Sequence, residues 1–540
     1  MTTRTSSDSF QDLDAIVIGA GFSGAYMLYQ LRRQGYSVKL LESGGGLGGV
    51  WYWNRYPGAR CDTHTPNYEF SMEECWKDWT WTERFPTYEE LGRYFEHVDK
   101  ALNLSPDIRF NSRVTKAVFD EDRSRWSIEC EDGFTADAKF LIPCLGFGTK
   151  PFIPEIPGLD EFSGTQLHTA HWPHDGSLTL ENKRVGVVGT GASGIQVAQE
   201  AAKVSSHLKV FQRTPNLAIA MQQEQLDINS QREDKKNYPD WFKRRAESDT
   251  GEFDWFLDPR STLEISAEER NAVFEAAWNR GGLRFWHPFE DTMSDLDANK
   301  FAYDFWREKV IARIDDPAVA EKLAPKVPPH PFGTKRPSLE MWYFDIFNQE
   351  NVELIDAKQD PIIKVTSSGI QTETEHHELD LIVLATGFDA GTGGLTSIDI
   401  QGANGRSLAE TWKTGVDTHL GIAVPGFPNM VLLYGPQSPS AFWNGPASAE
   451  QQGDWVMELL NFAREREFQR IDASVDASKA WTRHMAELAD STLLPMAKSW
   501  YMGANVPGKP VQLLHHIGVR EYIRHLDMCK ANSYDGFTFE

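Results

Sequence analysis

The chain has 540 residues, several times the ~150 residues of a typical domain, so we expect two or three domains. Its 54 Lys and Arg against 78 Asp and Glu give a net charge of −24, which repels phosphate backbones and anionic lipids and disfavours a nucleic-acid or membrane-surface binder. The 40% hydrophobic and 24% charged fractions are typical of a globular protein.

The cysteines and the N-terminal segment favour a cytoplasmic location. The 5 cysteines are scattered without Cys-x-x-Cys spacing, so neither a disulfide framework nor a thiolate zinc site is indicated. Residues 1–14 contain no apolar signal segment, and apolar runs such as 381–385 are too short to span a bilayer. No histidine or carboxylate spacing is typical of a metal site, so we expect no metal.

The first predicted unit is a strand, a glycine turn and a helix. The apolar run 15–18 enters a turn that is followed by apolar residues at helical spacing. The turn contains Gly19, Gly21 and Gly24. Such glycines let backbone N–H groups approach a pyrophosphate at the positive end of the helix. A second apolar run, 38–41, ends in Glu42, where a carboxylate suits ribose hydroxyls, so this unit predicts an FAD site. The alternative is an ordinary strand-to-helix turn.

A second unit repeats this pattern after the apolar run 185–188. Its turn contains Gly189, Gly191, Ser193 and Gly194. Its second strand, 208–211, is followed by Arg213 and Thr214 instead of an acid. Because a cation suits a 2′-phosphate that an acid would repel, this unit predicts an NADPH site. A solvated surface charge is the alternative role for Arg213.

The two units predict an α/β fold with one dinucleotide domain nested in the other. Each ends in an apolar strand closed by glycine, at 140–146 and 381–387, and the second unit is longer. Its extra residues, rich in charges and aromatic residues at helical spacing, predict a helical insertion. We expect Rossmann-like domains and an insertion with these bounds: FAD-binding, 1–150 and 388–540; NADPH-binding, 151–387; helical insertion, about 221–331.

Residues 162–173, between the two units, carry a family fingerprint. They read FSGTQLHTAHWP and match the F-x-G-x-x-x-H-x-x-x-W-P pattern of type I Baeyer–Villiger monooxygenases. The chain resembles this family, and within it the phenylacetone and steroid monooxygenase branch. Further matching stretches are 48–58, 59–62, 332–336, 385–389, 435–440 and 500–509.

The resemblance implies a flavin enzyme that acts on a ketone. NADPH would reduce bound FAD, O2 would add to give a C4a-peroxyflavin, and one oxygen would be inserted beside the carbonyl through a tetrahedral (Criegee) intermediate. The product is an ester or lactone. We expect no nucleic-acid or membrane partner, and a monomer or weak homo-oligomer.

The resemblance also implies roles for individual residues. Arg336 is the catalytic arginine that stabilises negative charge, Asp62 orients it, and Lys335 joins Arg213 at the NADPH 2′-phosphate. A surface charge for Arg336 and a helix cap for Asp62 are the alternatives. Trp500 belongs to a loop that folds over the nicotinamide, unless it is a buried core residue. The predicted flavin contacts are Val50, Trp51, Tyr52, Trp53 and Tyr68.

The fingerprint residues are predicted to act at a hinge. They are Phe162, Gly164, His168 and Trp172. We expect His168 to be a hydrogen-bonded hinge residue on the linker, not an acid or base, and Trp172 to be a packing residue.

Two departures from the family pattern affect the surroundings of the site. Residues 63–66 stand where relatives commonly carry a glutamate or serine beside Asp62, so we expect the surroundings of Asp62 to differ from the family pattern. The predicted substrate-pocket residues are Ala441, Phe442 and Trp443. The bulky Phe442 and Trp443 narrow the site if they point inward and only pack if they point outward. The sequence does not distinguish cyclic, aryl and linear ketones.

Three other functions are weighed against this one. A sulfoxidising or N-hydroxylating flavin monooxygenase shares both glycine turns, but the fingerprint and the pair Lys335 and Arg336 argue against it. A non-catalytic NADPH sensor would not need Asp62 or Arg336. A disulfide reductase is disfavoured because no cysteine pair follows the first turn.

Overall fold

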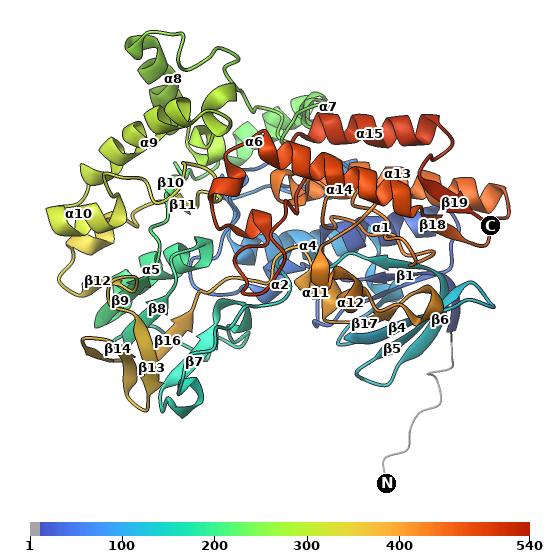
Figure 1. The fold of residues 1–540 in the computed structure, drawn as a ribbon, viewed down its shortest axis with the longest axis horizontal. Coiled ribbons are helices and arrows are strands. Elements are labelled where there is room, and N and C mark those ends of the chain that lie inside the picture. The colour runs from blue at the N-terminus through green and yellow to red at the C-terminus, as the bar shows by residue number, and fades with distance from the viewer. Residues whose placement is uncertain (1–10) are drawn as a thin grey trace.

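The computed structural model describes residues 11–540 (Figure 1). Residues 1–10, where the sequence predicts no signal segment, lie outside the described residues. Among the described residues, the helices are all too short or too polar to cross a membrane.

The first sheet is built from chain segments that come before and after the second sheet. Its seven strands have the order β17-β4-β5-β6-β1-β2-β3. Their bounds are β1 (Gln11–Ile18), β2 (Val38–Leu41), β3 (Ile108–Arg109), β4 (Val114–Asp120), β5 (Arg125–Cys130), β6 (Thr135–Pro143) and β17 (Asp399–Gln401). Strand β1 pairs in parallel with β2 and β6, and β17 pairs in parallel with β4. The chain therefore returns to this sheet after building the second one.

The second sheet is parallel throughout and has the order β12-β9-β8-β16-β7. Its strands are β7 (Thr165–His168), β8 (Arg184–Val188), β9 (His207–Gln212), β12 (Val352–Asp356) and β16 (Leu381–Leu384). The runs VGVV and LIVL are buried, as expected for parallel strands covered on both faces. A small antiparallel sheet is made by β13 (Ile362–Thr366), β14 (Gly369–Thr372) and β15 (His376–Glu378). The two sheets confirm the predicted α/β architecture of Rossmann-like units.

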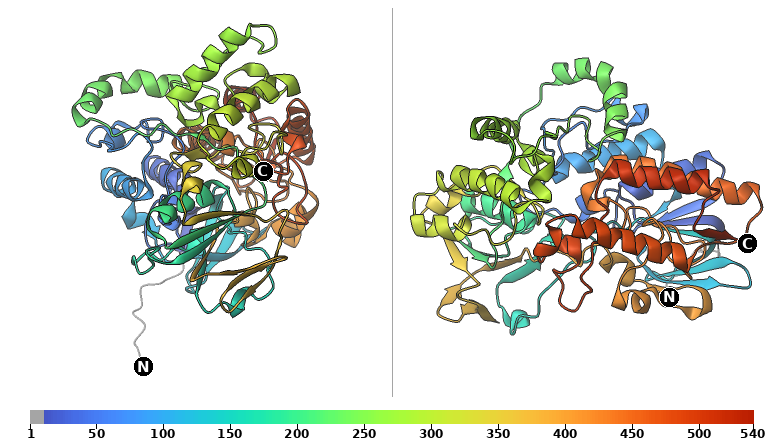
Figure 2. Two further views of the ribbon diagram at one scale, coloured as in Figure 1. Left: turned by 90° about the vertical axis from the view of Figure 1, so that its left-hand side faces the viewer. Right: turned by 45° about the horizontal axis from the view of Figure 1, so that its top comes forward.

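The helices divide into three groups (Figures 1 and 2). Those that follow the glycine turns are α1 (Phe22–Arg33) and α5 (Ala192–Val204). Those of the insertion are α6 (Ile228–Asp234), α7 (Tyr238–Ala246), α8 (Ala267–Arg280), α9 (Leu296–Ile311) and α10 (Pro317–Leu323). Those around the first sheet are α2 (Val50–Trp53), α3 (Glu73–Trp76), α4 (Tyr88–Leu102), α11 (Gly393–Thr396), α12 (Leu408–Thr411), α13 (Gly445–Glu465), α14 (Val475–Asp490) and α15 (Val519–Ala531).

Short sheets anchor the insertion and the C-terminus. Strands β10 (Ile219–Ala220) and β11 (Leu339–Glu340) pair in parallel and bracket the insertion. Strands β18 (Ile471–Ala473) and β19 (Phe537–Phe539) join the end of the chain to the segment before α14. Helix α13 lies on α1, where the Tyr26 hydroxyl donates to Asp454 at 2.6 Å.

The two connections between the sheets run antiparallel, side by side. The Phe152 N–H donates to the Gly387 carbonyl at 2.8 Å, and the Asp389 N–H donates to the Lys150 carbonyl at 2.8 Å. Both chain crossings are thus hydrogen-bonded to each other, and we call this paired segment the joint between the sheets.

Candidate active site

A cavity of about 1620 Å³ is lined by both glycine turns. Pockets for one small ligand typically have ~300–1,000 Å³, so this cavity has room for more than one ligand. The predicted residues that line it are Gly19, Gly21, Glu42, Val50, Trp51, Trp53, Asp62, Tyr68, Gly189, Gly191, Ser193, Arg213, Thr214, Lys335, Arg336, Ala441, Phe442, Trp443 and Trp500. Those outside its lining are Gly24, Tyr52, Phe162, Gly164, His168, Trp172 and Gly194.

The first turn requires its glycines for close backbone approach. Gly19 has φ +99°, and a Cβ there would lie 2.8 Å from the Cys144 carbonyl oxygen. A Cβ on Gly24 would lie 1.8 Å from the Gly19 carbonyl oxygen. Helix α1 begins after Gly21 with no side-chain cap, so its first N–H groups are available to an anion.

Glu42 braces the same turn. One carboxylate oxygen accepts from the Ala20 N–H at 2.7 Å, and the other accepts from the Gly44 N–H at 2.6 Å. Oε1 also accepts from the Ser43 hydroxyl at 3.3 Å, whereas Oε2 keeps a further lone pair that can accept from a ribose hydroxyl. Glu42 therefore fits both a structural and a cofactor-binding role.

The second turn has the same close contacts and a cationic end. A Cβ on Gly189 would lie 2.5 Å from the Ala385 carbonyl oxygen. Arg213 and Lys335 line the cavity, and neither forms an ion pair with a described residue. Burial and the nearby Arg213 charge lower the pKa of Lys335. Two cations without carboxylate partners fit a phosphate group.

Four glycines of the cavity lining have free space beside them, where bound groups would lie. A Cβ added to Gly146, Gly148, Gly191 or Gly387 meets no atom within 4 Å, and all four line the cavity. With two uncapped helix starts and the unpaired cations, these surfaces fit FAD and a nicotinamide dinucleotide phosphate.

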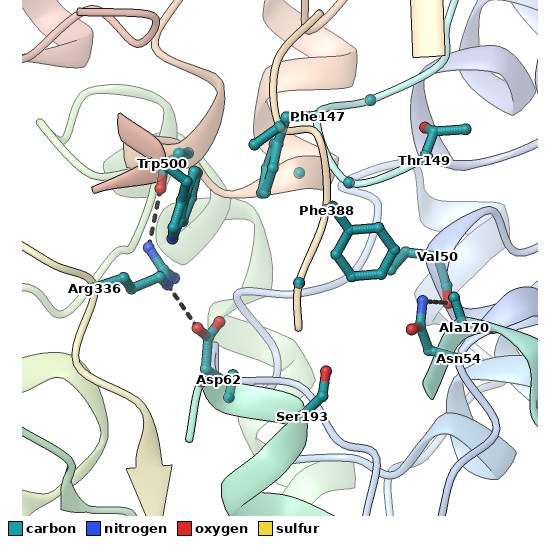
Figure 3. A pocket seen from close by; sticks show the side chains of 18 of the residues that line it. Val50, Asn54, Asp62, Phe147, Thr149, Ala170, Ser193, Arg336, Phe388 and Trp500 are labelled. Carbon is teal, nitrogen blue, oxygen red and sulfur yellow. Dashed lines mark hydrogen bonds and ion pairs between the residues drawn. The ribbon is translucent and has the colours of Figure 1, made fainter. Parts of the chain in front are cut away.

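Arg336 is held by two acceptors (Figure 3). Its Nε donates to Asp62 Oδ2 at 2.7 Å, and a terminal nitrogen donates to the Ala441 carbonyl at 2.9 Å. The guanidinium lies over the Trp286 ring, 5.4 Å from its centre. Burial opposes the charge, but Asp62 and the Tyr501 hydroxyl outweigh it and raise the pKa of Arg336. The side chain is thus a fixed cation.

Aromatic side chains wall the cavity around this cation. Trp500 stacks on Phe147, with ring centres 5.2 Å apart and planes at 12° (Figure 3). Trp51 Nε1 donates to the Tyr68 hydroxyl at 3.1 Å. Tyr52 instead contacts the loop that contains Gly45, and its hydroxyl accepts from the Gly45 N–H at 2.8 Å. Of the five predicted flavin contacts, four therefore line the cavity.

The fingerprint lies at the joint between the sheets. His168 Nδ1 accepts from the Ala170 N–H at 3.1 Å, and Nε2 lies 3.0 Å from the Gly387 carbonyl. This pairing requires the neutral Nε2–H tautomer. Burial lowers the pKa of His168 to about 4, so it is neutral at physiological pH. A Cβ on Gly164 would lie 2.6 Å from the Asp380 carbonyl oxygen, so this glycine is sterically required.

The two bulky residues of the predicted substrate loop point differently. Phe442 stacks on Trp286 at 5.7 Å and 20°, and lies 4.7 Å from the Tyr501 ring. Trp443 is buried, with its ring edge-on to Tyr522 of α15 at 5.9 Å. Phe442 thus narrows the space beside Arg336, whereas Trp443, although it borders the cavity, packs its ring against α15.

Several site residues were not predicted from the sequence. Tyr501 directly follows Trp500 in the stretch 500–509 that matches the family, so its position beside a predicted residue could have identified it. Trp286 lies in the insertion, where no motif marks it. His515 packs behind the aromatic wall: its Nδ1 lies 2.5 Å from Ser440 Oγ, and its ring is 5.2 Å from that of Trp500.

The departure after Asp62 creates a buried charged cluster. His64 Nε2 lies 3.2 Å from Asp254, and both Asp254 and Glu252 form ion pairs with Arg284. These contacts tie the loop after Asp62 to the insertion. Arg280 also pairs with Asp254 at 2.9 Å, so the two guanidinium groups balance the charges of the two carboxylates without a further cation.

The chain is similar to known proteins over nearly its whole length. Residues 13–236 match the family model described as pyridine nucleotide-disulphide oxidoreductase. The chain is 47% identical to cyclopentanone 1,2-monooxygenase of Comamonas sp. (strain NCIMB 9872), covering 100% of this chain and 99% of that protein. It matches oxidized steroid monooxygenase bound to NADP with a TM-score of 0.92 and 40% identity, covering 98% of this chain and 99% of the other. It matches OTEMO in complex with FAD and NADP with a TM-score of 0.94 and 34% identity, covering 98% and 100%.

Proposed function

The chain belongs to the type I Baeyer–Villiger monooxygenases, and from this premise we propose how its own residues convert a ketone to an ester or lactone. The enzyme uses FAD and NADPH. The observation that carries the proposed mechanism is the Arg336 and Asp62 pair, 2.7 Å apart, on a cavity shared by both glycine turns.

The cavity residues divide into holding and reacting groups. The first turn and Glu42 would hold FAD, and Arg213 with Lys335 would hold the 2′-phosphate of NADPH. Reduced FAD supplies the activated oxygen when it is bound. The chain's own contribution is to bind the two cofactors, orient the ketone and exclude water.

Arg336 stabilises the negative oxygen that develops from the ketone carbonyl. Asp62 and the Ala441 carbonyl fix the guanidinium before substrate arrives, so little reorganisation is left for the chemical step. The remaining donors of the guanidinium are available to the substrate oxygen. Trp500 and Phe442 exclude water from this part of the cavity, which strengthens the electrostatic effect of Arg336.

We propose small cyclic ketones as the substrates. Phe442 and Trp286 stack beside Arg336, and both apolar rings line the cavity at the cation. The relative that is 47% identical is named for cyclopentanone, a substrate of this size and shape.

A product panel tests this proposal against its alternative. The purified, FAD-loaded protein is given NADPH and, separately, cyclopentanone, a long linear ketone, an aryl ketone, a thioether and an amine. We expect the cyclic ketone to give a lactone with one added oxygen for each NADPH consumed. Oxidation confined to sulfur or nitrogen, with a flavin that NADPH reduces normally, would establish the sulfoxidising or N-hydroxylating alternative.

Domain division, location and assembly are also proposals. The return of β17 to the first sheet supports an FAD domain of 1–150 and 388–540, with the NADPH domain, 151–387, inserted between. Five free, buried cysteines support a cytoplasmic location. We propose a monomer or weak homo-oligomer. Limited proteolysis, cell fractionation and sedimentation velocity test these three points.

A further inference from the structure

Three histidines meet outside the cavity, at the C-terminal helices. His484 lies on α14, His516 in the loop before α15, and His525 on α15. One ring nitrogen from each lies within 4.8 Å of the other two. We call these residues the C-terminal histidine cluster. None of the three lines the cavity that contains Arg336.

The distances fit a metal ion with imidazole ligands. His484 Nε2 and His516 Nε2 are 3.1 Å apart. Tetrahedral zinc with Zn–N bonds of ~2.0–2.1 Å places its nitrogens ~3.3 Å apart, so these two rings need to move very little. The rings of His484 and His525 have centres 4.8 Å apart, which keeps the third ligand adjacent.

The surrounding residues hold these rings in place. Trp481 stacks on His516 with planes at 8° and meets His525 edge-on. The backbone N–H of His516 donates to the Ser438 carbonyl at 3.0 Å, which fixes the main chain that carries this ring. His516 is buried, and the other two are half-buried, so an ion can enter from one side. Such a preorganised set of rings is typical of a binding site.

The charges around the cluster suit a cation. Glu521 lies 3.3 Å from His525 Nε2, and Glu487 also acts on His484. Arg524 pairs with Glu521 and is the opposing positive charge. Burial lowers the pKa of all three histidines, so they are in the neutral form that binds metal.

We propose that the C-terminal histidine cluster binds one divalent transition-metal ion of the Zn²⁺ or Ni²⁺ class, with Glu521 or water as the fourth ligand. Neutral imidazoles favour these ions over Mg²⁺ and Ca²⁺, which require oxygen ligands. The ion clamps α14 to α15 and to the loop at His516. Since the neighbouring residue His515 packs edge-on against Trp500 at 5.2 Å, the clamp also steadies the aromatic wall.

Zinc titration of the FAD-loaded protein, prepared without an affinity tag and freed of metal by a chelator, tests this site. We expect saturable binding of one Zn²⁺ per chain, no comparable binding of Mg²⁺, and a higher melting temperature with Zn²⁺. Loss of one ligand should weaken binding more than the ~10–100-fold typical of a lost outer-shell partner. His484→Ala and His525→Ala should each show this loss.

Controls separate the site from surface binding and from misfolding. His207→Ala, at an exposed position on β9, should bind Zn²⁺ like the parent chain. Both test positions are half-buried, so at least one variant is expected to fold, as circular dichroism without metal will show. Co²⁺ in place of Zn²⁺ should give tetrahedral visible bands beyond the flavin absorption. Absence of one-to-one binding, or equal affinity in the folded variants and the parent, would overturn the proposal and leave a hydrogen bond between His484 and His516.

Discussion

The role of Arg336 is tested by Arg336→Lys, which keeps the charge and changes its shape. The guanidinium has five N–H donors and binds Asp62 at 2.7 Å and the Ala441 carbonyl at 2.9 Å, with donors left for substrate. Lysine carries its three donors on a single nitrogen. An ammonium that binds Asp62 therefore loses the planar arrangement that directs the other donors of Arg336 to the substrate. Removal of one oxyanion donor typically costs ~3–4 kcal/mol, or about 10²–10³ in kcat.

We therefore expect ester or lactone formation to fall about 10²–10³-fold in Arg336→Lys while NADPH still reduces the flavin. The unused reducing equivalents should appear as H2O2. The assay combines anaerobic stopped-flow reduction, product analysis by mass spectrometry and peroxide determination.

The matched control is Arg307→Lys. Like Arg336, Arg307 donates to one carboxylate and one backbone carbonyl: a terminal nitrogen donates to Glu321 at 3.0 Å and Nε to the Ala324 carbonyl at 2.9 Å, but Arg307 lies outside the cavity. This variant should retain product formation. If Arg336→Lys, with normal flavin reduction, forms product at a rate close to that of the parent chain, the proposed stabilisation by Arg336 is wrong.

Four further predictions follow from the same contacts. Asp62→Asn should lower kcat about tenfold by loosening Arg336, without slowing flavin reduction; unchanged kcat contradicts this. Arg213→Ala should lower kcat/KM for NADPH about tenfold or more and leave NADH unaffected; an equal loss with both coenzymes contradicts a 2′-phosphate contact. The pKa of His168 is about 4 in the folded chain and ~6.5 in the unfolded chain, so between these pH values the unfolded chain binds more protons. The free energy of unfolding should therefore decrease as the pH falls from ~6.5 to about 4, by up to ~1.4 kcal/mol per pH unit. Urea unfolding should show a shallower pH dependence in His168→Gln, and an identical slope contradicts the assignment. Phe442→Ala should raise kcat/KM for bulky ketones relative to cyclopentanone, and an unchanged ratio would place the substrate elsewhere.

The two glycine turns could be predicted because their determinants are local. Strand, turn, helix and the residue after the next strand follow one another directly, and steric limits at Gly19 and Gly189 act within each turn and its neighbouring strand. The fold class follows from these two units, and the two sheets of the structure confirm it. The contrast between Glu42 and Arg213 is also local, and it predicts the two cofactors from charge alone.

The site around Arg336 depends on contacts that no local pattern encodes. Arg336 and Asp62 are 274 residues apart, and only the family resemblance paired them in the sequence. Trp286 reaches the guanidinium from the helical insertion, and no spacing marks it. The individual site roles stay predictions until the variants are measured.

The sequence by itself determined the two nucleotide-binding units, because strands, turns and their charged ends are specified over short distances. Only the tertiary structure decided how Phe442 and Trp443 point, since both are apolar and their neighbours come from distant helices. It also brought together the C-terminal histidine cluster from α14, α15 and a loop, where sequence spacing had predicted no metal site. Side-chain convergence of this kind arises from packing between elements, which residue order does not display.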